Sequence, residues 1–232
     1  MHSNNEVGTF QPVHEVAALA ALNGIYFHTD AVQSLGAIPI DVNFPRVDLL
    51  TISSHKIYGP KGIGALYVRK GTKIKPLIHG GYQERGIRPG TENVCGIVGF
   101  GKAIELITNE LDENIKYITS LREYASAKFN AVFPDAVSNG HPTNRLPGNL
   151  NISFKSISGE TVVIILDTKG ICASTGSACA SGSTDTSHVL TSMGLSQIEA
   201  QNSVRFSFGK NNTKEEIDIM ISELQKAIGR LE

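Results

Sequence analysis

The chain has 232 residues, of which 41% are hydrophobic and 19% charged, and its formal net charge is −1 at pH 7. This balance is typical of a globular protein with one large or two modest domains, and it offers no electrostatic case for binding nucleic acid or an anionic membrane. No apolar run is long enough to cross a bilayer, the first residues lack a secretory signal, and the three cysteines have no framework spacing, so we expect a cytoplasmic protein with reduced thiols.

The first predicted elements are a helix and a strand that stops at an acid. Pro12 is expected to begin an amphipathic helix that ends at Asn23 and Gly24. The apolar run that follows, residues 25–30, is typical of a strand, and it ends at Asp30. Gln33 lies about one helical turn further on. A helix that feeds a strand is half of a βαβ unit, which predicts an α/β fold.

A second predicted strand end carries a lysine. Its apolar residues give way to Ser53, Ser54, His55 and Lys56, and a Gly/Pro turn separates these from a further strand at residues 65–68. In an open α/β sheet, ligands bind outside the carboxyl ends of the strands. A lysine held there can be partly desolvated, which lowers its pKa and frees its amine for covalent catalysis. A lone lysine is more often a surface residue, so this interpretation depends on the acid at the first strand end.

Carboxylate, amide and amine groups from two strand ends suit pyridoxal 5'-phosphate (PLP). This cofactor needs a lysine for its covalent link and an aspartate to keep its pyridine nitrogen protonated, here Lys56 and Asp30. Donors for the phenolic oxygen and for the phosphate complete the set, and Ser53 and His55 suit those tasks. Each of these residues alone is more often an ordinary turn residue, but the combination favours a PLP site.

The middle of the chain contains a loop rich in glycine and arginine and a long helical pattern. Residues 83–91 can present backbone amides and guanidinium groups to an anion, although a solvated basic loop is the alternative. From Val94 to about Val132, apolar residues recur every three or four positions, which predicts a long, bent helix. We expect a domain boundary near residue 105, and we expect Cys95 to be a small core residue.

The C-terminal part predicts an α+β domain. Its expected elements are a turn-rich segment at 134–148, a strand at 149–154, a helix from Ser158 to about Gly170, strands at 171–173 and 203–208, and a helix at 214–231 capped by Asn212 and Thr213. Arg205, on the last of these strands, suits bidentate binding of an amino-acid α-carboxylate. A salt bridge at a sheet edge is an equal alternative.

Residues 174–184 are almost all small and are expected to be mobile, because they bury little surface. Cys179 in this run is poorly placed for packing and well placed to carry a transferred group. An incidental thiol in a flexible linker is the alternative. Cys172 is expected within a strand and inert. A metal site from Cys172, Cys179 and His188 is disfavoured, because their spacing matches no standard zinc pattern.

Several motifs closely resemble those of the PLP-dependent cysteine desulfurases of the nitrogen-fixation and housekeeping iron–sulfur type, in the class-V aminotransferase family. They lie, in order, at residues 4–8, 28–34, 53–62, 83–86, 88–93, 175–182 and 203–209. The resemblance covers nearly the whole chain. Tyr82 and Pro89 depart from the family pattern, which usually has Gly and Ser there, and Pro89 removes an N–H from the anion-binding loop.

The resemblance implies a fold-type-I PLP-dependent transferase of the α/β class. Residues 1–105 would be the C-terminal part of a large domain with a mostly parallel sheet, and residues 106–232 a small α+β domain that carries the mobile cysteine loop. Met1 falls where a family member is already well into its large domain, so the resemblance implies that this domain is truncated.

The resemblance also implies a role for each candidate residue. The cofactor-binding residues are Asn5, Asp30, Gln33, Ser53, His55, Lys56 and, from the neighbouring subunit of a homodimer, Thr91. The catalytic residues are Lys56, His55 and Cys179, which becomes a persulfide, and the substrate-binding residues are Asn5 and Arg205.

The implied activity is transfer of sulfur from L-cysteine to Cys179, with release of L-alanine. A scaffold or another acceptor protein would take the sulfur for iron–sulfur clusters or other thio-cofactors. A selenocysteine lyase or another PLP lyase of the same fold is the nearest rival. An inactive fragment that docks to iron–sulfur assembly proteins is the alternative from a different class.

Overall fold

The structure is a computed structural model that describes residues 1–43, 46–176 and 186–229. The chain forms two units. The first comprises Met1–His2 and Gln11–Leu111, and the second comprises Ser3–Phe10 and Asp112–Glu232. The division falls after Leu111 rather than near residue 105, and the sequence did not indicate that Ser3–Phe10 belongs to the second unit. No helix in the described part of the chain is long and apolar enough to span a membrane.

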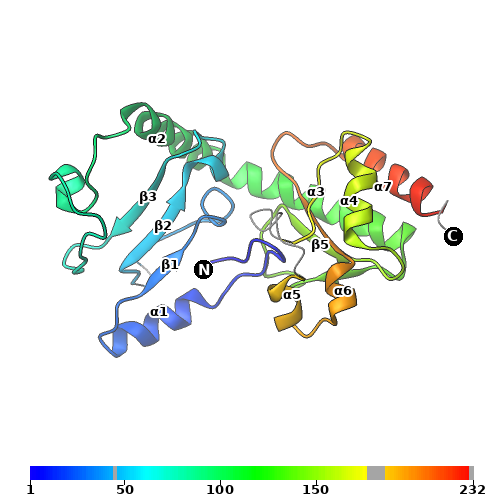
Figure 1. Cartoon of the computed structure of the whole chain (residues 1–232), viewed down its shortest axis with the longest axis horizontal. Helices are drawn as coiled ribbons and strands as arrows, with labels where there is room; N and C mark the ends of the chain where they lie inside the picture. The colour runs from blue at the N-terminus through cyan, green and yellow to red at the C-terminus, as the bar shows by residue number, and fades with distance from the viewer. Residues whose placement is uncertain (44–45, 177–185, 230–232) are drawn as a thin grey trace. The chain divides into compact units, whose positions relative to one another are not determined.

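The first unit contains a three-stranded sheet with the order β1–β2–β3 (Figure 1). β1 (His28–Asp30) runs parallel to β2 (Leu49–Ser53), and β2 runs antiparallel to β3 (Gly64–Val68). The predicted α/β class is confirmed, but the described sheet is mixed rather than mostly parallel, with one parallel and one antiparallel strand pair. β1 is shorter than the predicted strand, because the Asp48 carboxylate accepts a hydrogen bond from the Phe27 amide (3.0 Å) in place of a ladder partner.

The helices of the first unit follow the sequence pattern closely. α1 (Val13–Leu22) begins after Pro12 and ends at Asn23, as predicted. The short 3₁₀ helices η1 (Ser54–Ile57) and η2 (Gln83–Gly86) occupy the two turns. The predicted long helix is a pair, α2 (Val94–Asn109) and α3 (Leu111–Val132), with a break at Glu110.

The second unit contains an antiparallel sheet with the order β4–β5–β6. Its strands are β4 (Val137–Asn139), β5 (Asn149–Ser153) and β6 (Ser203–Ser207). The strands predicted at residues 149–154 and 203–208 are confirmed as β5 and β6, whereas β4 was not predicted. The predicted strand at 171–173 is wrong, because only Ser174 forms an isolated bridge, to Arg205.

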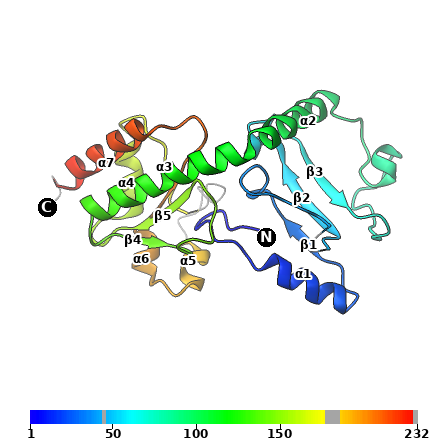
Figure 2. The same ribbon diagram turned by 180° about the vertical axis from the view of Figure 1, so that it is seen from behind.

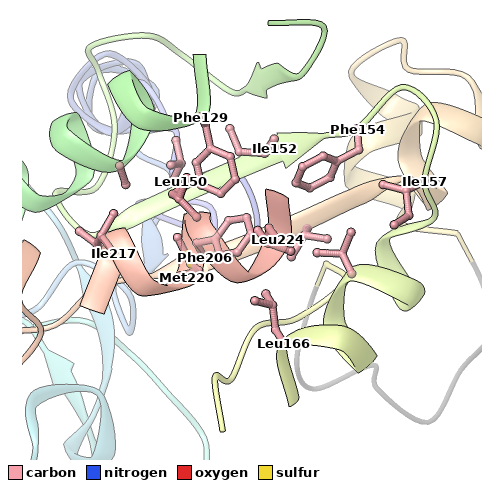
Figure 3. Packing of buried hydrophobic residues seen from close by; sticks show 14 of the residues in the cluster. Phe129, Leu150, Ile152, Phe154, Ile157, Leu166, Phe206, Ile217, Met220 and Leu224 are labelled. Atoms are coloured by element: carbon pink, nitrogen blue, oxygen red, sulfur yellow. The ribbon is translucent and has the colours of Figure 1, made fainter. Parts of the chain in front are cut away.

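Helices α3, α4 (Gly159–Asp167) and α7 (Lys214–Ile228) pack on the apolar face of this sheet, and Figure 2 shows α3 running across β4 and β5. Ser158 and Thr213 cap α4 and α7 as predicted. Figure 3 shows the core, in which Phe129 of α3 is fully buried and its ring centroid lies 4.9 Å from that of Phe206.

The other face of the sheet is polar but also buried. Because side chains alternate along a strand, Asn149, Asn151 and Ser153 of β5 point away from the core, yet they are only 6%, 0% and 7% exposed. The segment Ser3–Phe10 lies against these residues through the Asn149 and Asn151 side chains. Two short helices, α5 (His188–Ser192) and α6 (Gln197–Gln201), pack with Val7 in a small cluster.

Candidate functional site

The two predicted strand ends lie at the same edge of the first sheet. Asp30 ends β1 and is paired with Thr51 of β2. Because β1 and β2 are parallel, their carboxyl ends share one edge, and η1 with Lys56 follows β2 directly. The structure therefore brings Asp30 and Lys56 to neighbouring strand ends, as predicted.

The side chains at this edge also share one open face. Alternation along the strands places His28 and Asp30 of β1 on the same side as Thr51 and Ser53 of β2. His28 Nε2 and Thr51 Oγ1 are 2.8 Å apart. His28 and Asp30 are exposed, and Thr51 and Ser53 are half-buried. A carboxylate and hydroxyl groups thus line a face that no other described element of this unit buries.

Asp30 is held by local hydrogen bonds that fix its orientation. Its Oδ1 accepts from the Val32 amide (2.9 Å), an Asx turn, and its carbonyl accepts from the His2 amide (2.6 Å). In the described residues, no hydrogen bond is recorded to Oδ2, so that oxygen can accept from a ligand. Gln33 follows in the same turn and is half-buried.

Lys56 sits on a tightly built turn. Ser54 is fully buried beneath it, and Ile57 joins Phe100, Ala103 and Ile107 of α2 in a small core. Tyr58 adopts a left-handed conformation (φ 64°), which reverses the chain. These contacts fix the backbone of η1, while His55 and Lys56 themselves remain exposed.

The loop that carries Thr91 is held by its own side chains. Gln83 Oε1 accepts from the Gly90 amide (3.1 Å), and a Cβ on Gly80 would lie 2.8 Å from Cβ of Pro89. Glu84 and Arg85 both have positive φ angles, which are unfavourable for residues with side chains. Pro89 therefore packs inside a constrained turn, and Thr91 is exposed beyond it.

The two predicted substrate-binding residues meet in the second unit. Arg205 Nη1 donates to the carbonyl of Asn5 at 3.1 Å. The next residues are held just as firmly: Asn149 and Asn151 each donate to the Glu6 carbonyl (3.3 Å), and Arg145 donates to the Val7 carbonyl (3.1 Å). This network positions the Asn5 segment on the polar face of the sheet.

Arg145 is an unusual member of this network. It is 6% exposed, and burial, with a further contribution from Arg122, lowers its pKa to about 10. Its hydrogen bonds go to neutral oxygens, the Val7 carbonyl and Ser138 Oγ. The sequence did not indicate a role for Arg145, because an arginine in a turn-rich segment has no local signature of burial.

The cysteines only partly match expectation. Cys179 lies outside the described residues, so its predicted placement is not tested. Cys95 is exposed, not in the core, because it lies on the outward side of the first turn of α2, where Gly96 is buried instead; Cys172 is also exposed and lies in no strand. Among the described residues, no three His, Cys, Asp or Glu side chains gather closely enough to hold a metal ion.

Comparison with known proteins places the chain. Its fold is that of the fold-type-I PLP-dependent enzymes, since two NifS-like proteins superimpose on it closely. The first has a TM-score of 0.90 at 39% identity, and the match covers 99% of this chain and 60% of the other. The second, from Rickettsia africae, has a TM-score of 0.90 at 35% identity, and the match covers 98% of this chain and 60% of the other. The sequence model of class-V aminotransferases matches residues 1–220. The chain therefore belongs to the class-V aminotransferase family.

Curated relatives are more similar still. The cysteine desulfurase IscS of Dictyoglomus turgidum is 50% identical over 231 residues, which cover 100% of this chain and 59% of that protein. The cysteine desulfurase IscS of Methanosarcina thermophila is 49% identical over 231 residues, which cover 100% and 57%. The chain thus spans less than two thirds of the length of these relatives.

Proposed function

We propose that the chain is part of a PLP-dependent cysteine desulfurase that moves sulfur from L-cysteine to Cys179. The observation that carries this proposal is the arrangement of Asp30 and Lys56 at adjoining ends of two parallel strands, in a chain about half identical to named cysteine desulfurases. An amine, a carboxylate and hydroxyl groups at one open sheet edge are the groups that PLP requires, so the residues present fit the cofactor.

When bound, PLP supplies an electron sink that stabilises negative charge at the substrate α-carbon. In the first unit, Lys56 would hold the cofactor and move the α-proton of the substrate, and Asp30 would keep the pyridine nitrogen protonated. Gln33 would donate to the phenolic oxygen, and Ser53 and His55 would bind the phosphate. Thr91 from a second copy would complete the phosphate contacts.

In the second unit, Asn5 and Arg205 bind the substrate. The Arg205 guanidinium makes a charge-assisted pair with the α-carboxylate, and the Asn5 amide orients the substrate and the cofactor's phenolic oxygen. The hydrogen bond from Arg205 to the Asn5 carbonyl supports this pairing, because it fixes the two residues relative to each other.

The sulfur step balances without an oxidant. The Cys179 thiolate attacks the sulfur of L-cysteine, a sulfur–sulfur bond forms, and the carbon–sulfur bond of the substrate breaks. The electron pair of the broken bond passes to the β-carbon of the substrate, which takes up a proton. With its α-proton returned, the remaining fragment leaves as L-alanine. The outer sulfur atom of the persulfide then passes to an acceptor protein, for iron–sulfur clusters or other thio-cofactors; the sulfur–sulfur bond breaks and the Cys179 thiolate is restored.

We further propose that the enzyme is a cytoplasmic homodimer. Thr91 supports this, because the implied phosphate contact is made to a neighbouring subunit. Large apolar side chains beside this loop are also available to a second copy, since Leu77 and Tyr82 are each 93% exposed.

The purified chain with added PLP tests the function. We expect a visible absorbance band that shifts with L-cysteine, loss of the band in Lys56→Ala, and retention of the band with loss of sulfide release in Cys179→Ser. No band after addition of PLP would instead favour a cofactor-free module that docks to iron–sulfur assembly proteins. Faster turnover of selenocysteine than of cysteine would favour a selenocysteine lyase.

A further inference from the structure

Glu6 is a buried acid to which the chemistry above gives no role. It is 3% exposed, and its Oε2 accepts a hydrogen bond from Ser187 Oγ at 2.5 Å. Ser187 is also the N-cap of α5, where its hydroxyl oxygen accepts from the Leu190 amide (3.3 Å). The carboxylate thus contacts the residue at which α5 begins.

The same carboxylate borders Gly176. A Cβ on Gly176 would lie 3.1 Å from Glu6 Oε2 and 3.7 Å from Cβ of Ser187. Gly176 has a φ of +81°, where a side chain is strained as well as crowded. Gly176 and Ser187 therefore lie together beside one carboxylate, and they flank the part of the chain that contains Cys179.

Burial makes Glu6 and Ser187 depend on each other. A buried carboxylate is costly unless donors surround it, and in the described residues Ser187 is the one donor recorded to the Glu6 side chain, with no ion pair. The main chain of Glu6 is held separately: its amide donates to Asn4 Oδ1 (2.8 Å), and its carbonyl accepts from Asn149 and Asn151. The position of the carboxylate is therefore set by the segment that carries Asn5.

We propose that Glu6 is a positioning residue for sulfur transfer: its carboxylate ties the substrate-binding segment at Asn5 to Gly176 and Ser187, the residues on either side of the Cys179 segment. The inference rests on the proposed function, because it assigns Asn5 to the substrate and Cys179 to the sulfur. The inference adds a connection between the Asn5 segment and the Cys179 segment that neither Asn5 nor Cys179 supplies by itself.

Persulfide formation tests the role. The PLP-loaded chain is mixed with L-cysteine, and the gain of one sulfur atom at Cys179 is followed by mass spectrometry over a single turnover. Ser187→Ala should slow the reaction about 10-fold, the value expected for loss of a hydrogen bond to a charged group. Glu6→Gln should slow it by a smaller factor, because the glutamine amide oxygen still accepts from Ser187 but no longer carries the charge. The double variant should be no slower than Ser187→Ala, because both changes act on one interaction. The L-cysteine-induced shift of the cofactor band should occur at the same concentration.

Ser196→Ala is the matched control. Ser196 caps α6, a helix as short as α5, through a capping box with Glu199 and without contact to Glu6. Its loss should leave the persulfide rate unchanged. Unchanged rates in Glu6→Gln and Ser187→Ala, or a double variant slowed by the product of the two single effects, would overturn the proposal.

Hydrogen exchange on the cofactor-free chain separates this inference from the proposed function. Ser187→Ala should increase exchange at the amides of Glu6 and Val7 about 10-fold, and Glu6→Gln, which weakens the hydrogen bond without removing it, should increase exchange at Leu190 and Thr191 by a smaller factor. A purely local capping role would change α5 alone and would exclude the link. Absence of a cofactor band in the unmodified chain would defeat the proposed function without altering this exchange result.

Discussion

Arg205 Nη1 and the carbonyl oxygen of Asn5 are 3.1 Å apart and form a hydrogen bond that joins residues 200 positions apart in the chain. Arg205 thereby contacts the segment that carries Asn5, and we assign the side chains of both residues to binding of L-cysteine. A change at Arg205 should therefore act on substrate binding in two ways, through the lost charge and through the loosened Asn5 segment.

Arg205→Lys should weaken L-cysteine binding about 10- to 100-fold, since a lysine keeps the charge but cannot reproduce the paired donors of a guanidinium. The measurement is a titration of the cofactor band with L-cysteine. Arg122→Lys is the control, because Arg122, like Arg205, donates to a carbonyl, that of Leu146, but does not contact Asn5. Equal affinities in the two variants would contradict the assignment of Arg205.

Asp30→Asn should lower turnover on the order of 100-fold, the size of effect seen when one preorganised electrostatic group is removed from an active site. The amide can still accept from Val32, so the turn and the melting temperature should be preserved. Asp41→Asn is the matched control, because Asp41 Oδ1 makes the same kind of turn with the Asn43 amide (2.8 Å). An equal loss of turnover in the two variants would remove Asp30 from the site.

Gly59→Ala should destabilise the first unit by about 1–3 kcal/mol, because the added methyl group would collide with Ser54 Oγ and lie 3.0 Å from Cβ of Ala103. The displaced turn carries Lys56, so cofactor binding should weaken as well. Denaturant unfolding and the cofactor band measure the two effects.

Gly101→Ala gives the opposite sign. Gly101 lies inside α2, and a methyl group added there would meet no described atom within 4 Å beyond the backbone of its own helix, so alanine should stabilise the helix by about 0.5–1 kcal/mol. The same denaturant unfolding experiment measures this gain. If Gly59→Ala instead stabilised the first unit, the turn would have space for a methyl group that the structure does not show.

Asn151→Ala should destabilise the second unit by about 2–4 kcal/mol. The fully buried Asn151 amide donates to the Glu6 carbonyl, and its Oδ1 accepts from Asn139 Nδ2 at 2.7 Å, so truncation removes a buried hydrogen-bond partner from each. Asn130→Ala, on the exposed side of α3, should stay within about 0.5 kcal/mol of the parent in the same unfolding experiment.

The strand ends at Asp30 and Lys56 could be predicted because local patterns mark them. Apolar runs stop at polar residues, and a Gly/Pro turn follows the lysine. Caps such as Ser158 and Thr213 are equally local, and both were predicted correctly.

What the sequence could not reveal depends on distant contacts. The alternation of Asn149, Asn151 and Ser153 is typical of a solvent-facing strand side, yet Ser3–Phe10 covers it from more than a hundred residues away. Helices α5 and α6 are too short to show helical periodicity. Cys95 was misplaced because an apolar stripe does not reveal which side of the first turn of α2 is buried.

The route of the backbone has a practical consequence. The chain passes from one unit to the other after His2, after Phe10 and after Leu111, so no single cut yields two whole pieces. A fragment that starts at Asp112 would lack the strip that covers its own asparagine-lined surface. To isolate the second unit, residues 3–10 should be joined through a linker to a fragment that starts at Asp112. A simple cut at the break between α2 and α3 would leave these residues out.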